Sequence, residues 1–152
     1  MKRVLKNGMF LALLGIGVMM ASNSYVSATS GNVKDTVYRY NSKEDGRYSD
    51  TGARKKTNST KVYCICADGY KSYLSVRGTG VNRNTDKRMT ETRCSKWVSI
   101  PKLVQCSVTN TVYEKEYSKA RLRVSVNLDE SGNVSTYGEW SPDSTKNYHI
   151  VG

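Results

Sequence analysis

The chain has 152 residues, with 24 basic and 13 acidic residues and a formal net charge of +11. A charge of this sign favours polyanionic partners such as teichoic acid, anionic lipid or acidic polysaccharide. Only one histidine is present, His149, which excludes histidine-rich metal sites and disfavours a Ser-His-Asp triad. We therefore expect no metal, no cofactor and no catalytic residues.

The N-terminal region predicts a signal peptide at 1–28. Basic residues precede an apolar run from Met9 to Ala21, and Val26–Ala28 offers small residues for cleavage. The run is too short to span a bilayer, so we expect a secreted, extracellular protein with a single domain at 29–152. Removing three basic residues leaves a charge of +8 (21 − 13). Export makes nucleic acid an unsuitable partner.

Segments that alternate apolar and polar residues predict strands in the rest of the chain. The first is Asp35–Tyr40, and the polar segment 41–60 predicts a long loop or mobile arm. Lys61–Ala67 is apolar on both faces, which is typical of a central strand. Tyr73–Arg77 predicts the next strand, and Gly78 after it indicates a bulge or a close backbone contact.

The second half of the chain continues this pattern. A hairpin loop is expected at Asp129–Asn133, with Val134–Trp140 returning antiparallel to the strand before it and a polar tail at 143–152. No helical periodicity is found after the signal peptide. About seven strands therefore predict an all-β fold, a small antiparallel sandwich or barrel. The remaining strands are expected at Cys94–Ile100, Leu103–Val108 and Lys119–Leu128.

Each of the four cysteines lies on the apolar phase of its expected strand. In an exported protein this pattern predicts disulfides across the core. Cys64 and Cys66 share one strand face and are poorly placed to pair with each other. Two pairings remain open, Cys64–Cys94 with Cys66–Cys106, or Cys64–Cys106 with Cys66–Cys94. A four-thiolate zinc site fits this spacing poorly.

Basic residues in three places form the candidate anion-binding site. Lys119, Arg121 and Arg123 project from one face of the most regular strand, and Arg77 has the same outward phase on its own strand. We expect them to form one cationic surface with a basic run that precedes the central strand. That run is Arg54, Lys55 and Lys56.

Two stretches resemble a family of small exported proteins of unknown function from Gram-positive bacteria. The first is Ala53–Tyr63, which contains the basic run, and the second is Gly138–Ser144, which contains a Trp-Ser-Pro-Asp-Ser motif. The resemblance implies secretion and a compact β domain, and it supplies no activity. The cysteines are not part of it.

The leading hypothesis is a secreted, disulfide-stapled protein that binds an anionic cell-envelope polymer or membrane surface and is not an enzyme. A bacteriocin-like toxin is the first alternative, since such proteins are small, cationic and exported. A cell-wall glycan hydrolase is the second, because Glu114, Glu116 or Glu139 could provide paired carboxylates. In that case Glu114 and Glu116 are expected to share one strand face.

Overall fold

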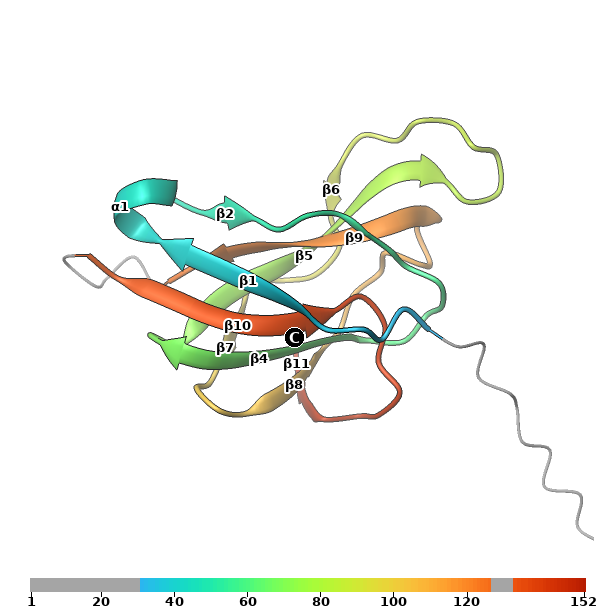
Figure 1. Ribbon diagram of the computed structural model, residues 1–152. Helices are drawn as coiled ribbons and strands as arrows, with labels where there is room; N and C mark the ends of the chain where they lie inside the picture. The colour runs from blue at the N-terminus through green and yellow to red at the C-terminus, as the bar shows by residue number, and fades with distance from the viewer. Residues whose placement is uncertain (1–30, 127–132) are drawn as a thin grey trace, which may run out of the picture.

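The computed structural model describes residues 31–126 and 133–152, so the expected signal peptide and most of the loop at Asp129–Asn133 lie outside the described residues. Within these ranges the protein has eleven strands and one four-residue helix. Two sheets pack face to face without closing into a barrel (Figure 1). The expected all-β sandwich is confirmed, with more strands than about seven. No helix in the described ranges is long and apolar enough to cross a membrane.

Sheet A has five strands and sheet B has six. The order in sheet A is β1 (Thr36–Asn41), β10 (Ser135–Ser141), β4 (Val62–Gly69), β8 (Gln105–Val108) and β11 (His149–Val151). The centre of sheet B is formed by β9 (Tyr117–Ser125) and β5 (Ser72–Asn82). Short strands pair with β9, namely β2 (Ser49–Asp50) and β3 (Arg54–Lys55), or with β5, namely β6 (Thr92–Arg93) and β7 (Val98–Ile100).

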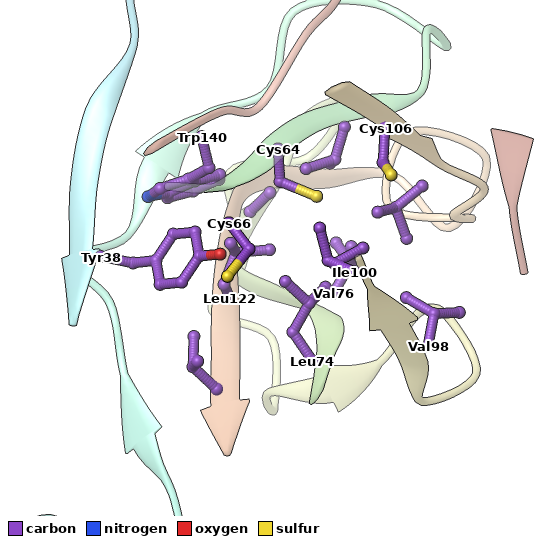
Figure 2. Close-up of a cluster of buried hydrophobic side chains, with 14 of the residues drawn as sticks. Tyr38, Cys64, Cys66, Leu74, Val76, Val98, Ile100, Cys106, Leu122 and Trp140 are labelled. Atoms are coloured by element: carbon purple, nitrogen blue, oxygen red, sulfur yellow. The ribbon is translucent and has the colours of Figure 1, made fainter. Parts of the chain in front are cut away.

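The predicted central strand is β4, which lies in the middle of sheet A between β10 and β8. Its inner residues Val62, Cys64 and Cys66 are fully buried. They face side chains from both sheets, among them Val76 and Leu122 (Figure 2). Alternation along each strand therefore predicts which face meets the core.

The predicted partner of β9 is wrong. β10 was expected to return antiparallel to β9, but it pairs with β1 and β4 in the opposite sheet. The two consecutive strands β4 and β5 likewise belong to different sheets. The chain crosses between layers at these places. Alternation identifies the buried face of a strand but contains no information about its neighbour.

The segment 41–60 is also more ordered than the polar composition suggested. It contains α1 (Ser42–Asp45), β2 and β3. The side chain of Asn41 caps α1 by accepting a hydrogen bond from Lys43 N at 3.0 Å. β2 and β3 both pair with β9, so this segment forms one edge of sheet B. The polar tail likewise ends in a strand, β11, which runs parallel to β8.

Gly78 permits the close contact that was expected at this position. A Cβ on Gly78 would lie 2.4 Å from the ring of Tyr117 and 2.9 Å from Cys94 Sγ. The expected bulge is present as a register shift between Thr79 and Asn82, where β5 pairs with β9. Of the single strand expected at Cys94–Ile100, only Val98–Ile100 forms a strand, β7, and β6 ends at Arg93, directly before this range.

Candidate anion-binding surface

The basic run before the central strand divides into three different environments. Lys55 is exposed on β3. Arg54 is half-buried, donates to the Trp140 carbonyl at 3.2 Å and lies over the Trp140 ring at 5.6 Å. Lys56 is 1% exposed. Only Lys55 is thus presented freely to solvent, and the expectation that Lys56 contributes to a cationic surface is wrong.

Lys56 forms a buried ion pair with Asp143. Its Nζ lies 2.8 Å from Asp143 Oδ1, and both side chains are 0% exposed. The same ammonium group donates to the carbonyl of Pro142 at 2.7 Å and to the carbonyl of Thr60. All three ammonium protons therefore have acceptors, which is the condition under which a charge can be buried.

Asp143 is equally well satisfied. Its Oδ2 accepts hydrogen bonds from Asn32 N at 2.8 Å and from the Thr57 hydroxyl at 2.6 Å. Burial raises the pKa of Asp143, but hydrogen bonds from Lys56 and Thr57 outweigh it and hold the pKa below its usual value. The carboxyl group is therefore ionised at neutral pH. The pair joins the two stretches that carried the family resemblance, so these stretches serve the fold.

The outer face of sheet B holds the remaining predicted arginines, together with two carboxylates. Arg77 and Arg121 are paired across β5 and β9. Arg123 makes two hydrogen bonds to Asp50, at 2.7 and 2.6 Å. Arg77 donates to Glu91 at 3.0 Å. The structure thus brings Arg77, Arg121 and Arg123 together as expected, but neutralises much of their charge.

Aromatic rings extend this arginine cluster toward both edges of sheet B. Tyr73 and Trp97 stack with their ring centroids 5.2 Å apart and their planes 14° from parallel. The guanidinium group of Arg123 lies 4.1 Å from the centre of the Tyr48 ring. We name this surface the aromatic–arginine face; it consists of Tyr48, Asp50, Tyr73, Arg77, Glu91, Trp97, Arg121 and Arg123.

The ion pair between Asp50 and Arg123 stabilises the charged form of both groups. The hydrogen bond from Arg123 lowers the pKa of Asp50, and the same bond raises the pKa of Arg123. Three arginines against two carboxylates leave a net charge of +1 (3 − 2). Lys119 on β9 and Arg93 on β6 are exposed and add positive charge. The surface is therefore cationic, and the side chains at its centre are held in fixed positions.

The cysteines do not form the predicted disulfide bonds. All four are free and buried thiols. Cys64 and Cys106 are directly opposite each other on β4 and β8 of one sheet, and their sulfurs point into the core (Figure 2). Cys66 contacts the Thr136 hydroxyl at 3.4 Å, whereas Cys94 packs beneath Gly78 in the other sheet. Bridges across the core were expected because alternation along a strand shows only which cysteines point inward. It does not show whether the nearest cysteine lies in the same sheet or in the opposite sheet.

The carboxylates considered for glycan hydrolysis are also dispersed. Glu114 and Glu116 belong to the turn before β9, so they do not share a strand face. Glu116 accepts hydrogen bonds from the side-chain amides of Asn82 and Asn84, at 2.6 and 2.9 Å. Glu139 lies on β10 of the other sheet. In the described part of the chain, no group of three or more His, Cys, Asp and Glu residues could hold a metal ion.

Several residues of the aromatic–arginine face were missed at the level of sequence. Tyr73 has the same outward phase as Arg77 and could have been included on that basis. Asp50 and Glu91 lie in segments expected to be loops, and no local pattern connects them to the arginines. Arg93 lies between the strands expected at Tyr73–Arg77 and Cys94–Ile100, and it becomes part of the surface only because β6 pairs with β5.

Comparison with known families confirms the expectation of a family of unknown function. A family model described as a protein of unknown function (DUF2712) matches residues 24–144. The chain belongs to the DUF2712 family. No curated protein and no solved structure matches it. The description of DUF2712 names no activity, so a function for this DUF2712 chain has to be argued from its surface. The Gram-positive origin stays a prediction.

Proposed function

We propose that the protein is secreted and binds an anionic polymer of the cell envelope, without catalysing a reaction, through the aromatic–arginine face. The observation that supports this is the combination of partly exposed aromatic rings and guanidinium groups on one sheet. From Tyr73 to Thr79 the outward residues of β5 extend over about 20 Å. Such a length accommodates several units of an extended polymer.

The side chains suit the two components of such a polymer. Guanidinium groups bind phosphate or carboxylate with paired hydrogen bonds. The Tyr73 and Trp97 rings offer apolar surface with polar tips, which is suited to sugar rings. An anionic membrane is a second possible partner with the same charge, and it is distinguished experimentally.

The test is binding of the purified protein at low salt to polyglycerol phosphate, to an acidic polysaccharide and to anionic vesicles. Trp97→Ala should weaken polymer binding about tenfold, the effect of losing about 1.4 kcal/mol. Tyr137→Ala is the matched control, because Tyr137 is an aromatic residue beside Arg39 on the opposite sheet. Binding to vesicles alone, or equal effects of the two variants, would contradict the proposal.

The bacteriocin-like alternative is tested with the same preparation. Growth inhibition of related bacteria that disappears in Trp97→Ala would identify the polymer as the target of a toxin. Binding without growth inhibition would favour a role in the cell envelope of the producing cell.

A further inference from the structure

An open pocket of about 670 Å³ lies at the end of the aromatic–arginine face. Its walls come from the end of β5, from the segment 88–91 and from β9. Arg88 and Arg121 line it together with Glu91. The other lining residues are Thr79, Gly80, Met89 and Thr90.

The fold fixes the position of Arg88. The side chain of Asn82 accepts hydrogen bonds from Asn84 N at 2.9 Å and from Thr85 N at 3.1 Å, which closes a turn. After this turn the chain runs back along β5, where Arg88 pairs with Val81. Arg88 is exposed, so its guanidinium group can reach a ligand in the pocket.

Arg121 has unused hydrogen-bond donors. Arg123 already donates hydrogen bonds to Asp50, and Arg77 already donates one to Glu91. The nearest carboxylate oxygens to Arg121 Nη1 lie 3.4 and 3.9 Å away. Among the described residues the side chain of Arg121 makes no hydrogen bond, and its Nε is buried without a hydrogen-bond partner. An arginine has five N–H donors, so most of its binding capacity is free.

The charge of the pocket also favours an anion. Arg88 and Arg121 line it with one carboxylate, Glu91, which leaves a net charge of +1 (2 − 1). Arg77 and Arg123 also approach Glu91, at 3.0 and 3.6 Å. A phosphate or carboxylate oxyanion would supply the acceptors that Arg121 lacks. It would also neutralise this excess charge, in a geometry that suits the planar guanidinium fork.

We propose that Arg121 and Arg88 form an oxyanion subsite, which holds one phosphate or carboxylate group of the bound polymer. The inference rests on the proposed function for the source of the oxyanion, while the subsite itself can be tested with small ligands. The bound group is either a phosphate ester or a sugar carboxylate, since both present the same oxygen acceptors.

The experiment titrates the full chain with glycerol phosphate and with glucuronate and follows the arginine Nε–H resonances by NMR. The Arg121 resonance should shift with at least one ligand, and the ligand that binds more tightly identifies the source. Arg121→Gln and Arg88→Gln should each weaken binding about tenfold or more, and Arg121→Lys should weaken it less. Arg39→Gln, at an exposed arginine of sheet A, should leave binding unchanged.

The outcomes separate this inference from the proposed function. If Arg121→Gln and Arg88→Gln bind polymer and small ligand like the unsubstituted chain, the subsite is wrong and polymer binding stands. If the small ligand binds in an Arg121-dependent way but no polymer binds, the subsite stands and the proposed function is wrong. If neither the polymer nor either small ligand binds, the subsite and the proposed function are both wrong. Unfolding midpoints of all variants, measured by circular dichroism, verify that each is folded.

Discussion

The protein contains two clusters of opposite charges, and they differ in burial and in composition. Lys56 and Asp143 are fully enclosed, and each has all its hydrogen-bonding groups satisfied by the other and by the backbone or a threonine. The arginines of the aromatic–arginine face are partly exposed and outnumber their carboxylates. A buried pair of opposite charges stabilises the fold, whereas positive charge that exceeds the nearby negative charge at the surface can bind a partner. A basic residue in the sequence therefore predicts a function only after its neighbours are known.

The largest expected effect is on the buried pair. Lys56→Met should lower the free energy of unfolding by about 3–5 kcal/mol, because the carboxylate of Asp143 would be left buried and unpaired. Urea denaturation followed by circular dichroism measures this change. Lys55→Met is the control, since Lys55 is the exposed neighbour on β3 and should change stability by less than about 0.5 kcal/mol. Equal losses in the two variants would mean that the pair is not enclosed.

Replacing both members of the pair should do less harm than replacing one. In Lys56→Met/Asp143→Leu no charge remains buried, so most of the stability lost in Lys56→Met should return. Thr57 and Asn32 N would still lack their acceptor, which prevents complete recovery. Denaturation of the single and double variants gives the coupling free energy. Strict additivity of the two single losses would exclude a direct interaction.

The expected effect of pH on stability is intermediate in size between the effects of the substitutions at the buried pair and at the surface. The pKa of Asp143 is lower in the fold than in the unfolded chain, where it is about 3.9. A lowered carboxyl pKa stabilises the fold above the unfolded value, and this contribution is lost as the pH falls through the folded value. Unfolding free energy should therefore decrease below about pH 4. The Lys56→Met/Asp143→Leu variant should show a shallower decrease, with Asp50 contributing to what remains; an unchanged slope would contradict the assignment.

The same contrast explains what could be predicted from sequence. Leu122 and Val124 alternate with Arg121 and Arg123, and this local pattern correctly predicted the buried and exposed faces of β9. The burial of Lys56 depends on Asp143, which is 87 residues away. No local pattern contains that partner. Strand order failed for the same reason, since the pairing of β10 with β4 is a long-range choice.

The smallest effect on stability is expected on the aromatic–arginine face, where binding should change more than folding. Asp50 is paired with Arg123 near the surface, and such pairs contribute at most about 1 kcal/mol. Asp50→Asn should therefore cost little stability.

Asp50→Asn also removes a negative charge and frees the guanidinium group of Arg123. It should therefore strengthen polymer binding at low salt, and the gain should disappear as added salt screens the surface. Asp143→Asn is the matched substitution at the buried pair and should lower stability without strengthening binding. Weaker polymer binding in Asp50→Asn would mean that Asp50 holds Arg123 in its binding position, and that the fixed geometry of the face matters more than its charge.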